Sequence, residues 1–108
     1  MNLRYDEIKE DVIDTYSSLH IRAEYEIKDT FYALLNDYEH SEEYTETEEC
    51  CIYVSFALLL IEKNKNIDFI KTRLNELLDN KKMEVHRIEL KDKIAEFTSD
   101  VNKLKGFL

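Results

Sequence analysis

The chain has 108 residues, one glycine, no proline and a formal net charge of −9. A chain of this length fits one domain, and the scarcity of residues that suit tight turns argues against a β-rich fold. Because the charge is negative, free nucleic acid and anionic membranes are poor partners, and we expect the protein to bind neither directly.

The spacing of apolar residues predicts two amphipathic helices in the first part of the chain. The first runs from about Asn2 to Ser18, and the second runs from about Arg22 to Glu39. Between the apolar residues of the first helix lie four acids, namely Glu7, Glu10, Asp11 and Asp14.

An acidic stretch follows, in which residues 37–51 read DYEHSEEYTETEECC, with seven carboxylates and no lysine or arginine. Thr45 and Glu48 have the spacing of a capping box, in which the threonine hydroxyl accepts from a free backbone N–H. Glu48 and Glu49 can therefore be explained as helix-start residues. The predicted third helix, about Glu48 to Asn64, is apolar nearly all round, so other helices must surround it.

A fourth helix is predicted from about Ile67 to Leu78, with Asn66 as its cap, and a fifth from about Met83 to Lys105. Apolar residues from Leu90 to Leu104 alternate four and three apart, which makes a heptad-like seam. We expect this seam to pack on the bundle, so a monomer is favoured over a dimer. The predicted fold is all-α, a single domain over residues 1–108, with about five helices around a central apolar helix.

Catalytic residues do not form a recognisable constellation, so we predict no enzyme activity, no cofactor and no metal. A single glycine excludes a glycine-rich phosphate loop. Asp37 and His40 have a spacing related to metal sites in helix bundles, but the spacing occurs once and at a helix end. Cys50 and Cys51 lie in acidic and apolar surroundings, which raise a thiol pKa, and we expect them to be buried and unreactive.

The cellular location is predicted from what the sequence lacks. The opening MNLRYDEIKEDV has no apolar segment of the kind a signal peptide needs. The longest apolar run, Cys50–Ile61, is too short to span a bilayer. A disulfide between the adjacent cysteines would close a strained ring. We therefore predict a reduced, cytoplasmic protein.

Charge is distributed unevenly along the chain. Residues 1–62 carry 16 acids and 4 bases, whereas residues 63–108 carry 8 acids and 11 bases. The seven tyrosines all lie before residue 54. Carboxylates bind arginine and lysine, and tyrosine rings attract cations, so the acidic stretch favours a basic protein partner. The alternative is a solvated loop whose charge only maintains solubility. The candidate partner-binding residues are Asp37, Glu39, Glu42, Glu43, Tyr44, Glu46 and Glu49.

Four segments resemble the bacterial polymorphic-toxin immunity proteins of the third immunity family: YDEIKEDVIDTY, FYALLNDYEH, ECCIYVSFALLLIEKN and IDFIKTRLNELL. The resemblance covers about residues 3–78. Proteins of that family are small and all-helical, are encoded beside secreted or contact-delivered toxins, and protect the producing cell by binding the toxin domain, often a nuclease. The resemblance implies a cognate toxin with a basic surface as the partner, and it assigns no catalytic or binding residue.

Two other functions fit the same residues. An acidic inhibitor that mimics DNA, for instance one of phage origin that targets a DNA-binding protein, would also be small and without catalysis. A helical dimeric adaptor would work through the seam from Leu90 to Leu104. A neighbouring toxin gene would favour the immunity protein, and a concentration-dependent mass would favour the adaptor.

Overall fold

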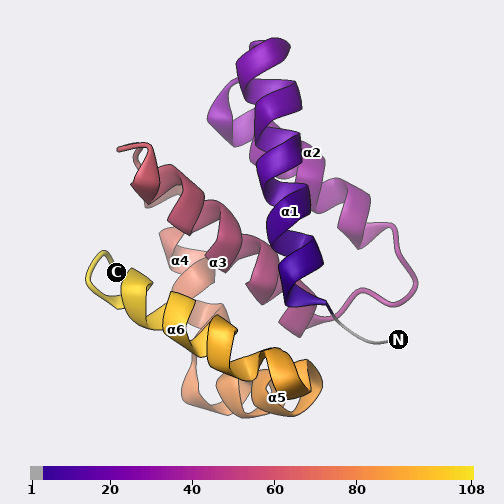
Figure 1. Ribbon diagram of the computed structural model, residues 1–108, viewed down its shortest axis with the longest axis vertical. Coiled ribbons are helices and arrows are strands. Elements are labelled where there is room, and N and C mark those ends of the chain that lie inside the picture. The colour runs from indigo at the N-terminus through magenta and orange to yellow at the C-terminus, as the bar shows by residue number, and fades with distance from the viewer. Residues whose placement is uncertain (1–3) are drawn as a thin grey trace.

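In the computed structural model, which describes residues 4–108, the chain begins with helix α1 (Tyr5–Thr15) and continues into a π-helical segment, Tyr16–Arg22 (Figure 1). The apolar face of α1 is buried against α3, as the three- and four-residue spacing predicts. The helical path extends beyond the predicted end at Ser18, because the π-helical segment continues through Ser17 and Ser18. The predicted start at Asn2 lies outside the described residues.

Helix α2 (Ile27–Glu39) begins five residues later than the predicted start at Arg22. The reason is a turn in which Glu24 adopts a φ of 60°, a left-handed conformation that is uncommon for residues other than glycine. No glycine marks this turn, so the sequence does not reveal it.

Helix α3 (Glu46–Glu62) lies at the centre of the fold, as predicted. It packs against α1, α2, α4, α5 and α6, and residues 50–57 are all buried. Aromatic rings fill the space beside it: the Phe31 and Phe56 ring centroids are 4.9 Å apart. A helix with no polar face has to be enclosed in this way, since every side would otherwise expose apolar surface to water.

Helix α4 (Asp68–Leu77) agrees with the predicted fourth helix to within one residue at each end. The N-cap residue is Ile67, one residue after the predicted cap Asn66, whose Oδ1 accepts a turn hydrogen bond of 2.6 Å from the backbone N–H of Asp68.

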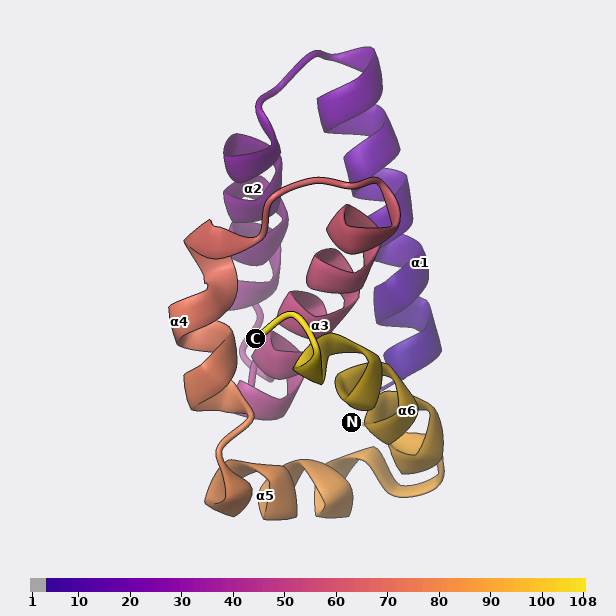
Figure 2. The same cartoon turned by 90° about the vertical axis from the view of Figure 1, so that its left-hand side faces the viewer.

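The predicted fifth helix is wrong as a single element. The chain forms α5 (Asn80–Leu90), a 3₁₀ turn (Lys91–Lys93) and α6 (Ile94–Lys105). Lys91 has a φ of 51°, which breaks the helix, and Figure 2 shows α5 crossing the end of the bundle before α6 turns back. The apolar spacing continues across the break from Leu90 to Ile94, so the break cannot be recognised from the spacing of apolar residues.

The seam from Leu90 to Leu104 belongs to the core, as expected. Leu90, Phe97, Val101 and Leu104 are each at most 2% exposed, so these side chains pack on the bundle and are not free for a second chain.

The all-α bundle is confirmed. The described part of the chain contains six α-helices and no strand, and none of its helices combines the length and apolarity needed to cross a membrane.

A buried polar link fixes α1 against α6. The Tyr5 hydroxyl donates to Asp100 Oδ2 at 2.6 Å, and Lys9 Nζ donates to the same oxygen at 2.9 Å. Asp100 is only 4% exposed. Burial, together with the Asp100 carboxylate, raises the pKa of Tyr5, so the hydroxyl keeps its proton and remains a donor.

Candidate functional site

The acidic stretch ends α2, forms the connection to α3 and makes the first turn of α3. Thr45 is the N-cap residue, and its Oγ1 accepts from the backbone N–H of Glu48 at 3.2 Å. The predicted capping role of Thr45 is thus confirmed. Carboxylates in this first turn also lie at the positive end of the helix dipole, which favours their charged form. The turn directs consecutive acids to different sides of α3.

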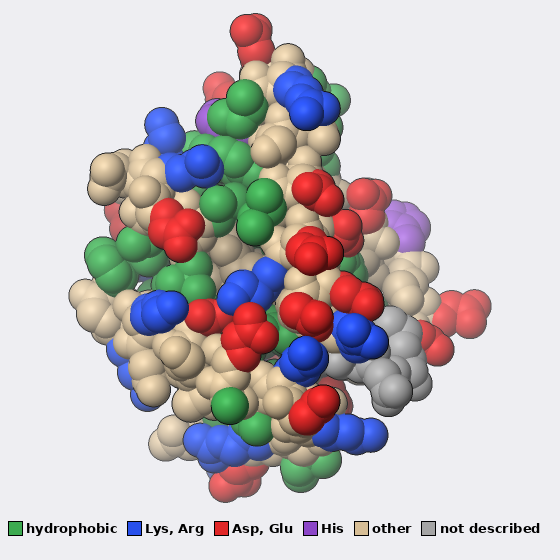
Figure 3. Space-filling model, in the orientation of Figure 1, with side chains coloured by type: hydrophobic (Ala, Val, Ile, Leu, Met, Phe, Trp, Pro, Cys, Tyr) green, Lys and Arg blue, Asp and Glu red, His purple; other side chains and the backbone are tan. Residues whose placement is uncertain are grey.

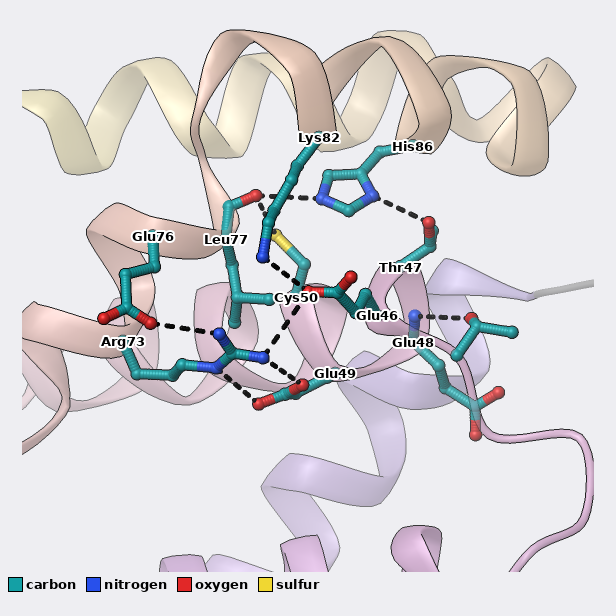
Figure 4. Close-up of polar contacts among 11 residues, drawn as sticks. Glu46, Thr47, Glu48, Glu49, Cys50, Arg73, Glu76, Leu77, Lys82 and His86 are labelled. Carbon is teal, nitrogen blue, oxygen red and sulfur yellow. Dashed lines mark hydrogen bonds and ion pairs between the residues drawn. The ribbon is translucent and has the colours of Figure 1, made fainter.

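Glu46 and Glu49 turn toward bases supplied by α4 and α5 (Figure 4). Arg73 holds the Glu49 carboxylate with two nitrogens, Nε and Nη2, each at 2.9 Å. Glu46 lies 2.6 Å from Lys82 Nζ and 3.5 Å from Arg73 Nη2. Arg73 also pairs with Glu76 at 3.0 Å. We call this group, Glu46, Glu49, Arg73, Glu76 and Lys82, the Arg73 side.

Charge pairing on the Arg73 side shows in the pKa values of its members. The hydrogen bond from Lys82 lowers the pKa of Glu46, and the hydrogen bond to Glu49 raises the pKa of Arg73. These two candidate partner-binding acids, Glu46 and Glu49, are therefore engaged within the protein, where they join α3 to α4 and α5. Bidentate pairing of arginine with a carboxylate is among the stronger ion-pair geometries.

A buried histidine reinforces the same junction. His86 Nε2 lies 2.9 Å from the Leu77 carbonyl oxygen, and His86 Nδ1 lies 2.7 Å from Thr47 Oγ1. Because a carbonyl can only accept, Nε2 donates to Leu77, and Nδ1 shares the second hydrogen bond with the Thr47 hydroxyl. The ring is fully buried, and both nitrogens are used, so His86 is structural.

Tyr44 faces the protein more than the solvent. It packs against the hydrophobic core, and its hydroxyl is sealed from solvent with no hydrogen-bond partner among residues 4–108. Burial raises the pKa of Tyr44, and the carboxylates of Glu49 and Glu39 raise it further. Its ring is thus less available to a partner than its position in a charged loop suggested.

The remaining candidate acids are exposed. Asp37 and Glu39 lie in the last turn of α2, and Glu42 and Glu43 lie in the connection to α3. Within the described part of the chain, no lysine, arginine or histidine lies within ion-pair distance of these four carboxylates. Their charges are therefore available to a partner.

Glu48 differs from every other acid in the stretch. It is 4% exposed, and its side chain points away from Arg73 and Lys82 (Figure 4). Its carboxylate has no hydrogen bond or ion pair to any residue from 4 to 108. Burial raises the pKa of Glu48, and the Glu43 charge raises it further.

The acids of α1 were not among the candidate residues, yet α1 packs against α3, the helix that carries Glu48. The Tyr38 hydroxyl donates to Asp11 Oδ2 at 2.6 Å, which joins α2 to α1. Burial raises the pKa of Tyr38 most, and the carboxylates of Asp11, Glu48 and Glu7 raise it further. Figure 3 shows carboxylates gathered along the surface of α1. We call the following residues the acidic face: Glu7, Glu10, Asp11, Asp14, Glu43 and Glu48.

The signal for the acids of α1 was present in the sequence. Residues 7, 10, 11 and 14 are spaced so that a helix places them on one side. Their link to α2 could not be predicted, because it depends on Tyr38 reaching Asp11 across 27 residues of sequence.

Neither cysteine is placed for nucleophilic chemistry. Cys50 and Cys51 are fully buried, as expected, and burial raises the pKa of Cys50 to about 12 and that of Cys51 well above its ordinary value. His40 Nδ1 lies 2.7 Å from the Asn36 carbonyl oxygen. Over residues 4–108, no three histidine, cysteine or acidic side chains are grouped as metal ligands would be.

Comparison with known proteins identifies no relative: no family model, no curated protein and no solved structure matches the chain. The resemblance to immunity proteins therefore stays a prediction.

Proposed function

We propose that this chain is an immunity protein that binds and neutralises a cognate bacterial toxin with a basic surface, such as a nuclease domain. The observation that carries the proposal is the acidic face, whose carboxylates project from α1 and from the α2–α3 connection. A nuclease surface is basic because it must hold phosphates, and an acidic inhibitor uses the same charges for attraction.

The distribution of charge supports inhibition by binding rather than by chemistry. Net charge of the first 62 residues is −12, and the Arg73 side neutralises only part of it. An acidic surface of this kind steers a basic partner and can raise the association rate by about 10 to 1,000-fold at low salt. Affinity would come from a few desolvated contacts within the interface.

Two candidate sets of contact residues follow from the geometry. The exposed acids Asp37, Glu39, Glu42 and Glu43 retain their proposed role in attracting the partner. Glu46 and Glu49 could bind a partner only by giving up contacts with Lys82 and Arg73, so we assign them a structural role first. Glu7, Glu10, Asp11 and Asp14 join the proposed interface in their place; among them, Glu7 forms an exposed ion pair with Arg4 at 3.6 Å.

The experiment that tests this function uses the gene next to the one that encodes this chain. Its product is expressed in a bacterial host with and without this chain, and the two proteins are then purified together at low and at high salt. We expect the neighbouring protein to be toxic alone, to be harmless with this chain present, and to remain bound at high salt.

Two results would count against the proposal. A neighbouring gene product that is harmless, or that does not bind this chain, would contradict the proposal that the partner is a toxin encoded by that gene. Retention of many basic proteins that all dissociate in salt would mean that the acids provide generic charge only. Specific binding to a chromosomal DNA-binding protein would instead support the DNA-mimic alternative.

A further inference from the structure

The end of the molecule opposite α5 is a turn that leads from the π-helical segment into α2 (Figures 1 and 2). Every residue from 21 to 26 is exposed, and we call this segment the α1–α2 turn. It presents two large apolar side chains, Ile21 at 59% exposure and Tyr25 at 47%. Tyr32, which follows in α2, is 46% exposed. Three of the seven large apolar side chains that are exposed in the described part of the chain therefore lie close together in sequence.

Hydrogen bonds fix the backbone of the α1–α2 turn. The Tyr25 N–H donates to the Leu19 carbonyl oxygen at 2.8 Å. The Tyr25 carbonyl oxygen accepts from His20 Nδ1 at 2.6 Å, because a carbonyl can only accept. Glu24 has a φ of 60°, and a residue stays in this disfavoured region only where its surroundings hold it there. Both backbone polar groups of Tyr25 are thus occupied, and its exposed ring projects from an ordered position.

The Tyr32 ring is supported by the core. It lies edge-on to Phe31, with ring centroids 5.5 Å apart. Phe31 is fully buried and makes an edge contact with Phe56 at 4.9 Å. Tyrosine has only two side-chain torsions, and the backbone beneath both exposed rings is already ordered. A partner that buries Tyr25 and Tyr32 therefore removes little conformational freedom, which lowers the cost of binding.

The charges around the α1–α2 turn are not neutralised within the part of the chain that the structure describes. Residues 10–45 contain ten acids and two bases, which gives a net charge of −8. None of these charged side chains forms an ion pair with another residue from 4 to 108, in contrast to the acids of the Arg73 side. Glu24 and Glu26 flank Tyr25, and the two bases are Arg22 and Lys28. A basic surface is therefore the best complement to the exposed rings and their surroundings.

We propose that Tyr25, together with Ile21 and Tyr32, is the apolar anchor of the interface with a basic protein partner. The inference rests on the proposed function and names the contacts that supply affinity, while the acids attract the partner. Tyrosine is frequent at binding hot spots, since its ring is large and rigid and its hydroxyl can still form hydrogen bonds. Nucleic acid, an anionic membrane surface and a second copy of this chain are poor occupants, because each carries negative charge.

Site-specific photo-crosslinking in the organism that encodes the chain tests the anchor. A benzophenone amino acid replaces Tyr25 in one variant, Tyr32 in a second and Val85 in a third. Val85 is the matched control, because it is 49% exposed and lies on α5, at the opposite end of the molecule (Figure 2). Crosslinked proteins are identified by mass spectrometry. Each is then purified, and its affinity is measured for the wild type, Tyr25→Ala and Val85→Ala.

We expect positions 25 and 32, and not position 85, to crosslink to a basic protein. Tyr25→Ala should weaken binding of that protein by about tenfold or more, as for a hot-spot residue, whereas Val85→Ala should change it by no more than about threefold. Circular dichroism should show that both alanine variants are folded, since substitutions of exposed side chains alter stability little.

Four results would overturn the inference: crosslinking that is no stronger at positions 25 and 32 than at position 85, crosslinking to an acidic protein, crosslinking only between copies of this chain, or a Tyr25→Ala protein that binds as tightly as the wild type. The two proposals can fail separately. A basic partner other than the neighbouring gene product, bound through Tyr25, supports the anchor and contradicts the proposed toxin. A toxic neighbouring gene product that binds the wild type and Tyr25→Ala equally supports the proposed function and contradicts the anchor.

Discussion

The two sides of the first turn of α3 carry similar acids but contrasting environments. On the Arg73 side, Glu46 and Glu49 meet Lys82 and Arg73 at 2.6 and 2.9 Å. On the acidic face, the buried Glu48 carboxylate has no ion pair or hydrogen bond with any residue from 4 to 108. The contrast teaches that charge density in a sequence does not by itself mark a binding surface. The arrangement of partners around each charge separates structural acids from available ones.

The contrast has an energetic side as well. The ion pair with Arg73 compensates for part of the hydration that the Glu49 carboxylate loses on burial. The buried Glu48 carboxylate has no such ion pair among the described residues. An uncompensated buried charge that lowers stability is typical of a functional position, where function opposes stability. Substitutions on each side should therefore have opposite effects.

The largest effect is expected from breaking the helix that supports both sides. Val54 is 0% exposed, and Val54→Asp places a lone charge in the core at a cost of several kcal/mol, a large share of a domain's stability of about 5–15 kcal/mol. We expect loss of the cooperative unfolding transition, measured by circular dichroism. Val85→Asp is the control, since Val85 is 49% exposed. A folded Val54→Asp protein would refute the central position of α3.

A smaller loss is expected on the Arg73 side. Arg73→Met keeps the length of the side chain but leaves Glu49 without its two hydrogen bonds. We expect a loss of about 1–2 kcal/mol in denaturant unfolding, reduced from the value for a buried pair because the guanidinium is partly exposed. Lys71→Met, which removes an exposed contact with Asp68, should cost much less. Equal losses for the two variants would mean that the Arg73 side is not structural.

On the acidic face the sign should reverse. The pKa of Glu48 is raised above its ordinary value of 4.5 in the folded protein, so its ionisation destabilises the fold as the pH rises through the folded-state pKa. Glu48→Gln should therefore stabilise the protein near neutral pH, by about 0.5–2 kcal/mol, a usual yield for one stabilising substitution. The gain should vanish below about pH 4.5, where wild-type Glu48 is protonated in both states. Thermal unfolding at several pH values measures it, and a destabilised Glu48→Gln protein at neutral pH would contradict the contrast.

The smallest effect on stability is expected in the connection between α2 and α3. Glu42→Lys combined with Glu43→Lys changes exposed charges and should alter stability by no more than about 0.5 kcal/mol. The same change should slow association with the neighbouring gene product and reduce its dependence on salt. Stopped-flow measurements at two salt concentrations provide the comparison. An unchanged salt dependence would exclude this connection from the interface.

Much of the fold could be predicted because its signals are local. The apolar spacing of α1 and α4 and the continuous apolarity of α3 identify the helices and the centre of the bundle. The turns at Glu24 and Lys91 could not be predicted, since each residue adopts a positive φ that its type does not indicate. The helices on both sides of the break at Lys91, α5 and α6, pack against α3.

The candidate site was predicted less well, for a related reason. Pairing of Glu49 with Arg73 joins residues 24 positions apart, and pairing of Glu46 with Lys82 joins residues 36 apart. Such contacts depend on how the helices pack, which composition and spacing do not specify. The acidic stretch was correctly identified as a region of unusual charge, but its division between two sides of α3 required the fold.

The most direct test of the whole account is hydrogen–deuterium exchange on the complex with the neighbouring gene product. The account predicts slower exchange on binding in α1 and in the α2–α3 connection through the first turn of α3, with little change in α4 and α5. Slower exchange confined to α4 and α5 would contradict it, because the partner would then sit on the side whose acids are already paired.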